Sequence, residues 1–313
     1  MSEMEKKPIA NRRAFLKQLG GMGAALLFMP RAAIAAEQPV ITKPIPATGE
    51  RLPVIGMGTW ITFDVGNNSY ERAVRARVMQ AFFDNGGALI DSSPMYGSSE
   101  EVIGEGLKTI KNRDRLFAAT KVWILGKRSG IRQMEDSQKL WGVPRFDLMQ
   151  IHNMLDWETH WETLREWKAA GRVRYVGITT SHGSRHDAMV KAMERTPFDF
   201  VQFTYSLEDR SVEQRLLPLA QERGMAVIIN RPFDGGDLFR RVRGKPLPPW
   251  AAEFDCRNWA QYFLKFIVSH PAVTCAIPAT SKVDHMVENM GAGFGRLPNA
   301  EMRRRMVEYF ERL

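Results

Sequence analysis

The strongest constraint on the fold is an alternation of short apolar runs with segments of helical period, repeated eight times along the chain. Glycine and proline stand at the joints between the two kinds of segment. The expected strands lie near 54–58, 87–91, 116–121, 147–152, 173–178, 199–203, 225–230 and 273–278, and the expected helices near 70–85, 99–110, 129–141, 158–170, 185–194, 212–223, 257–269 and 282–290. Eight strands, each followed by a helix, within about 270 residues predict an α/β protein of the (β/α)8 TIM barrel class.

An open doubly wound sheet uses the same alternation, but it usually carries a glycine-rich phosphate loop after its first strand. Here Gly56-Met57-Gly58 is followed neither by a third glycine nor by a helix, so the pattern favours the barrel. The stretch 41–55, ITKPIPATGERLPVI, precedes the repeats and has turn residues at its centre. It predicts an N-terminal β-hairpin that closes the bottom of the barrel.

The first 35 residues have the composition of a targeting segment. Arg12-Arg13 precede an apolar stretch over 19–29, and a small-residue site follows at 33–35. About eleven apolar residues are too few to span a bilayer, so no stable membrane anchor is expected. The segment resembles a cleaved twin-arginine signal peptide. We therefore expect the twin-arginine export machinery as a partner, a periplasmic or otherwise exported protein, and one mature domain over 36–313.

The excess of positive charge does not indicate a nucleic-acid partner. The net charge is +9, and the first 35 residues contribute four of these charges through six Lys or Arg against two Glu. The longest basic run elsewhere, 303–305, lies in a helical stretch and is typical of a solvated face.

The cysteine and histidine spacing indicates no metal site. No Cys-x-x-Cys pair is present, and His182 and His186 lack an acidic third ligand although their spacing would suit a metal. A disulfide between Cys256 and Cys275 stays open, but a chain of this size does not need one.

Four ionisable residues follow three neighbouring strands of the expected barrel. Asp91 ends the apolar run 88–90, and Tyr96 lies on the loop after it. Lys121 ends the third strand and His152 ends the fourth. Because the carboxyl ends of barrel strands meet at one mouth, where barrel enzymes carry their chemistry, we expect these four side chains to form one catalytic group.

The four residue types suit protonation of a carbonyl oxygen. A free phenol has a pKa near 10, and a lysine ammonium close to Tyr96 lowers that pKa. Asp91 pairs with Lys121, so that no buried charge stays alone, and His152 orients the carbonyl oxygen. The sequence has no Gly-x-Ser-x-Gly elbow for a nucleophile, so we expect a cofactor to deliver hydride to the carbonyl carbon.

These motifs resemble those of the aldo-keto reductase family from about residue 40 to the C-terminus. The family's Asp, Tyr, Lys and His tetrad matches the four residues above in order, and further likeness lies in GMGTW at 56–60, GRVRYVGI at 171–178, VQFTYSLEDR at 201–210 and AIPATSKVDHMVEN at 276–289. The resemblance implies reduction of an aldehyde or ketone by NADP(H), with NAD(H) as the alternative and Tyr96 as general acid. It implies cofactor contacts from Thr179, Thr180, Gln202, Arg231, Phe233, Ser281, Lys282, Glu288 and Asn289.

The implied cofactor contacts divide along the nucleotide. Gln202 would contact the nicotinamide carboxamide, Ser281 and Lys282 the adenosine phosphates, and Glu288 and Asn289 the adenine. Arg231 would reach the pyrophosphate, and Phe233 would replace a tyrosine that often stacks on the nicotinamide.

Three positions depart from the family pattern. Thr179-Thr180 stand where Ser-Asn is usual, Asn230-Arg231 stand where the stacking tyrosine is common, and His285 stands where an arginine often pairs with the 2′-phosphate. The preference for NADPH therefore depends on Lys282.

Aromatic and methionine side chains after three of the strands predict the substrate pocket: Trp60, Trp123, Met154 and Trp157. They imply an apolar or aromatic carbonyl substrate. The stretch 231–254, with three glycines, is expected to fold over the cofactor as a lid. Two other functions stay open, a catalytically silent nucleotide- or ligand-binding module of the same fold and a non-redox barrel enzyme such as a lyase.

Overall fold

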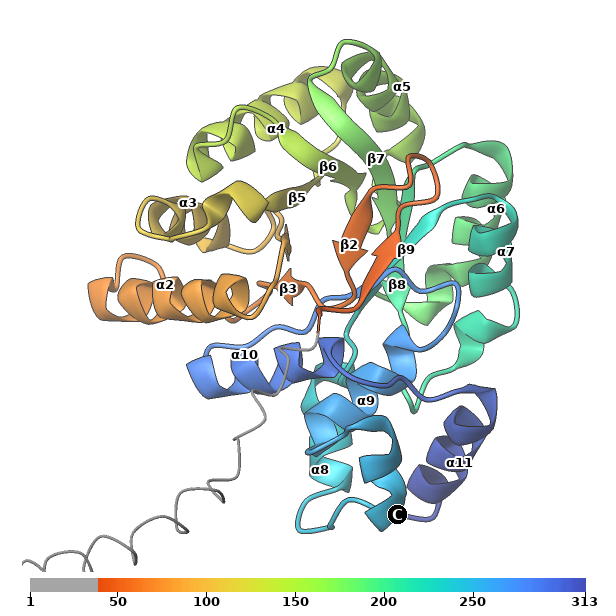
Figure 1. The fold of residues 1–313 in the computed structure, drawn as a ribbon. Helices are drawn as coiled ribbons and strands as arrows, with labels where there is room; N and C mark the ends of the chain where they lie inside the picture. Colours follow the sequence, from red (N-terminus) through yellow and green to blue (C-terminus); the bar gives the residue numbers. More distant parts are fainter. Residues whose placement is uncertain (1–38) are drawn as a thin grey trace, which may run out of the picture. The chain divides into compact units, whose positions relative to one another are not determined.

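The computed structural model describes residues 39–313, and the expected signal peptide lies outside them. Eight parallel strands neighbour one another in chain order (Figure 1): β3 Met57–Gly58, β4 Leu89–Asp91, β5 Phe117–Val122, β6 Phe146–Ile151, β7 Val173–Thr179, β8 Phe200–Thr204, β9 Ala226–Asn230 and β10 Cys275–Ala276. The first and last strands also meet, because the Gly56 N–H donates to the Ala276 carbonyl at 2.9 Å and the Gly58 N–H to the Pro278 carbonyl at 3.1 Å. The predicted (β/α)8 barrel is confirmed.

The predicted N-terminal hairpin is also confirmed. Strand β1, Thr42–Pro44, pairs antiparallel with β2, Arg51–Pro53. Figure 1 shows this hairpin across one end of the barrel. Ile45 and Leu52 of the hairpin are buried in the same apolar cluster as the side chains inside the barrel, so the hairpin closes that end.

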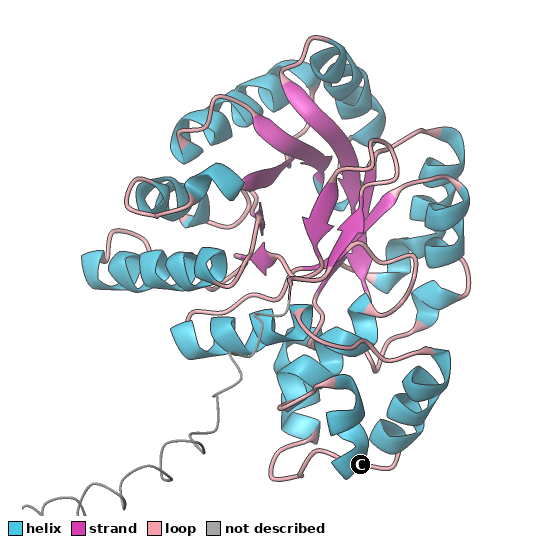
Figure 2. Cartoon of the chain, viewed as in Figure 1, coloured by secondary structure: helices cyan, strands magenta, loops and turns pink. Residues whose placement is uncertain are grey.

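Helices surround the strands (Figure 2): α2 Ser69–Asp84, α3 Ser99–Leu107, α4 Lys127–Trp141, α5 Trp157–Ala169, α6 His186–Arg195, α7 Leu216–Glu222, α8 Asp237–Arg241, α9 Trp259–Val268, α10 Val283–Met290 and α11 Ala300–Glu311. Asn68, Asn258 and Asn299 cap α2, α9 and α11 by accepting a backbone N–H of the first turn. The helix expected at 212–223 is divided into a 3-10 turn, Ser211–Glu213, and α7. The division precedes Pro218, which fits a first helical turn but interrupts a helix interior.

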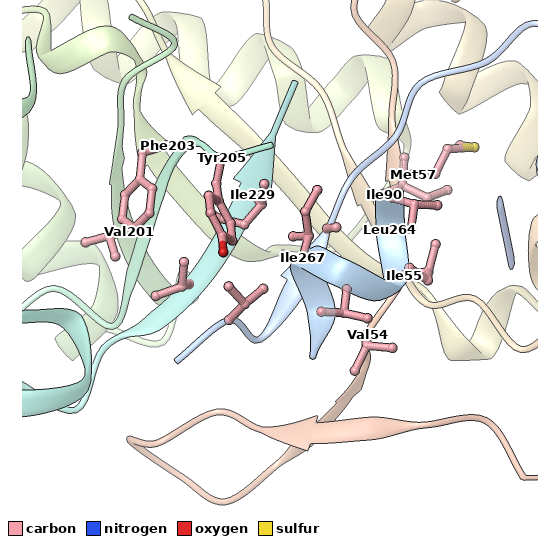
Figure 3. Packing of buried hydrophobic residues seen from close by; sticks show 14 of the residues in the cluster. Val54, Ile55, Met57, Ile90, Val201, Phe203, Tyr205, Ile229, Leu264 and Ile267 are labelled. Atoms are coloured by element: carbon pink, nitrogen blue, oxygen red, sulfur yellow. The ribbon is translucent and has the colours of Figure 1, made fainter. Parts of the chain in front are cut away.

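The outer faces of the strands and the inner faces of the helices form the larger apolar core. Figure 3 shows part of it, with Val201 and Phe203 of β8, Ile229 of β9, and Leu264 and Ile267 of α9 in one cluster. Along β8 and β9, the core residues that point outward alternate with residues that point into the barrel, because successive side chains of a strand point to opposite faces.

The inward-pointing residues divide into a lower, apolar layer, to which some strands contribute two residues, and an upper, polar layer that positions the candidate site. The lower layer is apolar and contains Leu89, Phe117, Ala119, Leu148, Tyr175, Phe200, Ala226, Ile228 and Cys275. Two residues further along β4, β5, β6, β8 and β9 the same face carries polar side chains, namely Asp91, Lys121, Gln150, Gln202 and Asn230. Gly177 of β7 makes room there, since a Cβ atom at this position would lie 2.9 Å from the Phe200 carbonyl oxygen and 3.1 Å from Gln150 Cγ.

The stretch 231–254, predicted to be a lid, is a packed segment. It contains the 3-10 turns Asp234–Gly236 and Pro249–Phe254 on either side of α8. Leu238 and Val242 are buried in the outer core. The segment is therefore anchored to the barrel through its apolar side chains.

Cys256 and Cys275 are buried free thiols, so the two do not form a disulfide. Among the helices of residues 39–313, none combines the length and the apolarity that a bilayer span requires.

Candidate active site

Asp91, Lys121 and Tyr96 meet at the carboxyl end of the barrel, as the sequence predicts. Asp91 is the last residue of β4, and Lys121 lies near the end of the adjacent β5. Lys121 Nζ donates to Asp91 Oδ2 at 2.5 Å and lies 3.3 Å from the Tyr96 hydroxyl. Lys121 is 0% exposed and Asp91 is 2% exposed, so this ion pair is sealed from solvent. Such a pair requires further hydrogen bonds, one of which goes from Lys121 Nζ to the Ser92 carbonyl at 2.8 Å.

The loop after β4 holds Tyr96 through a tight turn. The Tyr96 N–H donates to the Ser93 carbonyl at 3.0 Å, which closes a β-turn with Pro94 at its second position. Gly97 follows with φ +57°, and Asp64 accepts a hydrogen bond from the Ser98 N–H at 2.9 Å. A Cβ atom on Gly97 would lie only 2.3 Å from the Asp64 carboxylate, so this close approach requires glycine. The residues between Asp91 and α3 therefore form a turn that holds the Tyr96 hydroxyl near Lys121.

The proton of Tyr96 stays on the phenol at neutral pH. Burial raises the pKa of Tyr96 above its ordinary value, and this effect exceeds the opposite effect of the Lys121 ammonium. The sequence predicts a net lowering, so the structure corrects the direction while it keeps the lysine in the predicted role. Burial acts to lower the pKa of Lys121, but Asp91 and Tyr96 together outweigh it and leave that pKa raised. The site therefore presents a protonated phenol beside a permanent ammonium.

His152 stands beside the phenol as a neutral imidazole. It is the first residue after β6, and its ring meets the Tyr96 ring edge-on with 5.6 Å between centroids. Burial, together with repulsion by Lys121, lowers the pKa of His152 to about 2. Its Nδ1 lies 2.8 Å from the Ser93 hydroxyl, which fixes the ring and leaves Nε2 available for a ligand. A neutral imidazole can therefore orient a carbonyl oxygen without competing as an acid.

Three amides extend the site from Asp91 across the barrel. Gln150 Nε2 donates to Asp91 Oδ1 at 2.8 Å, and Gln202 Nε2 donates to the same oxygen at 3.1 Å. Asn230 Nδ2 donates in turn to Gln202 Oε1 at 3.2 Å and to the Thr180 carbonyl at 3.0 Å. The sequence predicts Gln202 here and misses Gln150 and Asn230. Their signal is a polar residue at an inward position of an otherwise apolar strand.

The two threonines at the end of β7 make hydrogen bonds with neighbouring loops. Thr179 Oγ1 accepts the Asn153 N–H at 3.0 Å, and Thr180 Oγ1 donates to the His182 carbonyl at 3.2 Å. Both threonines are buried. The backbone at Thr180 is held beside Gln202, because the Thr180 N–H donates to the Gln202 carbonyl at 2.9 Å.

Arg231 borders a cavity of about 340 Å³ at the mouth, beside Ser181, His182 and Ser206. Its backbone has φ +49°, a left-handed conformation that is uncommon for a residue with a side chain. Its guanidinium lies 3.5 Å from the Asp234 carboxylate. The Phe233 ring, nearby in the sequence, packs 4.8 Å from the Phe239 ring. The structure places Phe233 in the packing of α8 against the barrel.

The four residues predicted to hold the adenosine end lie around the start and end of α10. Lys282 is the exposed N-cap of this helix, and Ser281 precedes it. The helix N-terminus and the lysine both favour an anion at this corner, and Asp284 in the first turn of α10 opposes them. Glu288 is exposed, whereas Asn289 is 3% exposed.

Exposed apolar side chains lie on three successive loops that follow the strands of the tetrad region. They are Trp60 and Ile61 after β3, Met95 after β4, and Trp123, Ile124 and Leu125 after β5. The Trp123 ring lies 6.4 Å from the His152 ring, so Trp123 is a neighbour of the tetrad. Met154 and Trp157 are half-buried and pack on the outer core, and the Trp157 ring contacts Phe198 with 6.3 Å between centroids. The apolar rim thus comprises residues that the sequence predicts and others that it misses.

Comparisons with known proteins agree with this geometry. Methylglyoxal reductase YeaE of Escherichia coli K12 is 26% identical to this chain over 258 residues, which cover 80% of the chain and 89% of that protein. The NADH-specific methylglyoxal reductase of the same organism is 25% identical over 225 residues, which cover 62% of the chain and 68% of that protein.

Solved structures resemble the fold over most of the chain. An aldo/keto reductase of Klebsiella pneumoniae in complex with NADP and acetate superposes with a TM-score of 0.68 at 24% identity, over 84% of this chain and 93% of that one. The holo form of aldo-keto reductase AKR11C1 of Bacillus halodurans gives 0.71 at 21% identity, over 87% and 96%. The family model for the aldo/keto reductases matches residues 54–305. The chain therefore belongs to the aldo/keto reductase family.

Proposed function

We propose that the protein is an NADP(H)-dependent reductase that converts an aldehyde or ketone to an alcohol, with Tyr96 as general acid. One observation carries the proposal, the sealed Lys121–Asp91 pair whose ammonium lies 3.3 Å from the Tyr96 hydroxyl. A phenol in this setting keeps its proton until a stronger base forms nearby. The family supports the class of reaction, since relatives of this chain bear the names of oxidoreductases.

The residues account for the proton that carbonyl reduction consumes. NADP(H), when bound, supplies a hydride to the carbonyl carbon. The carbonyl π electrons move to the oxygen, and Tyr96 transfers its proton there, so that the product is a neutral alcohol. The phenolate left behind is stabilised by the Lys121 ammonium until a proton from solvent restores it. His152 holds the carbonyl oxygen through a hydrogen bond from Nε2 and excludes other orientations.

The rim supports a substrate with an apolar or aromatic group next to its carbonyl. Trp60 is 45% exposed and Trp123 is 40% exposed, and both stand on loops that surround the phenol. Burying such faces against a ligand yields roughly 25 cal/mol per Å² of apolar area. A substrate that covers both rings would therefore bind more tightly than its short-chain analogue. Trp157 and Met154 remain candidates for the same pocket.

The residues around the mouth fit a dinucleotide phosphate. Lys282 at the start of α10 and Arg231 beside the mouth cavity would hold its phosphates, and the acceptor atoms of the amide series suit a carboxamide. Gln202, Ser281, Glu288 and Asn289 would complete the contacts, with Thr179 and Thr180 placing the backbone. Because one relative is an NADH-specific enzyme, NAD(H) is the alternative cofactor.

The direct test is a turnover assay with a purified aromatic aldehyde. Consumption of NADPH should equal formation of the alcohol, and the same protein should titrate with NADPH by fluorescence. Nucleotide binding without turnover across a panel of aldehydes and ketones would instead identify a catalytically silent binding module. A protein that neither binds NADPH nor reduces any aldehyde or ketone of the panel would contradict the proposal.

Recognition of the 2′-phosphate of NADPH should depend on the side chain of Lys282. Replacing Lys282 by alanine is expected to weaken NADPH binding by about 1.5–3 kcal/mol, the contribution of a hydrogen bond to a charged group, and to leave NADH nearly unchanged. Dissociation constants for both nucleotides, measured on the same preparations, provide the comparison. Equal weakening of the two would show that Lys282 does not contact the 2′-phosphate.

We also propose that the protein crosses to its compartment with the nucleotide already bound. The twin-arginine-like segment at 1–35 supports this proposal, because that route carries folded proteins. Retention outside the cytoplasm requires slow dissociation. Arg231, the cationic residue of the packed segment 231–254 among those that line the mouth cavity, is the candidate for holding the pyrophosphate.

Protein isolated from the export compartment should therefore release near-stoichiometric NADP(H) on denaturation. Arg231→Ala should release nucleotide faster, and this substitution avoids a deletion that would remove the buried Leu238 or Val242. Replacing Arg12-Arg13 by lysines should leave the protein in the cytoplasm. Exported protein without nucleotide, and with only weak affinity for it, would contradict the scheme.

A further inference from the structure

The side chain of Asn230 ends a series of amides whose orientations are set by one carboxylate. Asp91 Oδ1 can only accept, so Gln150 and Gln202 must each present an amino group to it, at 2.8 and 3.1 Å. The Oε1 atom of Gln202 is thereby directed away from Asp91 and accepts from Asn230 Nδ2. The Thr180 carbonyl accepts from the same nitrogen at 3.0 Å. Two acceptors thus fix the amino group of Asn230, and with it the position of its oxygen.

That oxygen is a buried acceptor without a partner. Asn230 Oδ1 is enclosed and accepts no hydrogen bond from any residue of 39–313. The residue as a whole is half-buried at the carboxyl end of β9, on the inner face of the barrel mouth. An unpaired buried acceptor costs free energy that a fold rarely tolerates without a reason. At a ligand mouth the reason is a donor that arrives with the ligand.

We propose that Asn230 positions the cofactor by accepting a hydrogen bond from the carboxamide N–H of the nicotinamide. The inference rests on the proposed function and assigns to it a residue beyond the tetrad. A lone acceptor repels phosphate and carboxylate oxygens, so the partner must be a neutral or cationic N–H or O–H group. A carboxamide amino group offers two such hydrogens. Gln202 Oε1, with one lone pair still free, is the second acceptor close by.

This assignment accounts for two departures from the family pattern at once. Thr179-Thr180 remove the asparagine that commonly contacts the carboxamide, and both threonine hydroxyls are engaged locally. Asn230 removes the aromatic side chain that commonly stacks at the end of this strand. Asn230 on β9 then supplies the carboxamide contact that Thr179-Thr180 at the end of β7 do not make. It contacts the edge of the nicotinamide, whereas an aromatic side chain at this position would stack on its face.

The test compares two nucleotides that differ only in the carboxamide. The oxidised 3-acetylpyridine analogue of NADP⁺ replaces the carboxamide by an acetyl group and has no N–H donor. Calorimetric titration of the wild-type chain should give tighter binding of NADP⁺ than of the analogue. In Asn230→Leu, NADP⁺ binding should weaken roughly five- to tenfold, the size of one buried hydrogen bond, and analogue binding should stay unchanged. The ratio of the two dissociation constants should therefore fall by the same five- to tenfold, while the contact with Gln202 keeps NADP⁺ the tighter ligand.

A matched control is Thr204→Val, which changes the register partner of Asn230 on β8 without touching the amide series. It should keep the wild-type ratio. Asn230→Ala replaces Asn230→Leu if the leucine variant does not fold, and thermal unfolding monitors both. An unchanged ratio in the Asn230 variants of a chain that binds NADP⁺ would overturn this inference alone. A wild-type chain that binds no nucleotide would overturn the proposed function together with it.

Discussion

Replacing Tyr96 by phenylalanine is expected to lower the rate of carbonyl reduction by about 10²–10⁴-fold and to leave nucleotide affinity nearly unchanged. The substitution removes one hydroxyl and keeps the ring, so its edge-on packing against His152 stays in place. The loss falls on kcat because the proton moves only in the transition state. Single-turnover decay of NADPH absorbance with a saturating aldehyde measures the effect without interference from product release.

A control for this experiment is His152→Gln, which keeps a side-chain donor but removes the imidazole. It should raise KM and lower kcat moderately, because it affects the orientation of the carbonyl and not the source of the proton. Wild-type turnover by the Tyr96→Phe protein would show that another group protonates the oxygen. The Ser93 hydroxyl, which contacts His152 at 2.8 Å, would then be the next candidate.

The sequence predicts that the four side chains of the tetrad meet, because a simple geometric rule governs their positions. Strand ends in a parallel barrel meet at one mouth, and a period of two determines which residues point inward. Asp91 and Lys121 obey both rules and meet as expected. The same rules, applied to every strand, would also have found Gln150 and Asn230, which lie at inward positions of β6 and β9. Neither residue is predicted as part of the site, because an uncharged amide side chain is less distinctive in a sequence than an ionisable one.

Other features of the site depend on distances that no one-dimensional pattern contains. The direction of the Tyr96 pKa is set by a competition between burial and Lys121, and only the enclosed geometry shows that burial is the larger effect. Phe233 and Trp157 are apolar residues near strand ends, a description that fits pocket and core alike. Their rings contact Phe239 and Phe198, in helix packing. Glycines likewise do not distinguish a lid from a packed segment, and in 231–254 the side chains of Leu238 and Val242 are buried in the outer core.

Replacing Lys121 by methionine should have the largest combined effect on activity and stability. Methionine fills similar space but leaves the Asp91 carboxylate without its cation, inside a region where both partners are almost fully buried. Removal of one partner from such a pair typically costs 3–5 kcal/mol, so we expect a loss of about that size in the free energy of unfolding. The two amide donors to Asp91 should keep the loss toward the lower end of the range. Urea unfolding at neutral pH provides the measurement.

The double variant Asp91→Asn/Lys121→Met separates the two roles of the lysine. Asparagine removes the unpaired charge, so stability should recover most of what the single variant loses. Activity should not recover, because no ammonium remains to stabilise the phenolate of Tyr96 when it has given up its proton. Restored turnover in the double variant would mean that Lys121 acts only by neutralising Asp91. Unchanged stability in the single variant would mean that Asp91 is satisfied by Gln150 and Gln202 alone. If the single variant loses stability and the double variant stays inactive, the buried Lys121–Asp91 pair serves the chemistry of Tyr96. The fold then bears the desolvation cost of the pair because it keeps a cation 3.3 Å from the proton donor.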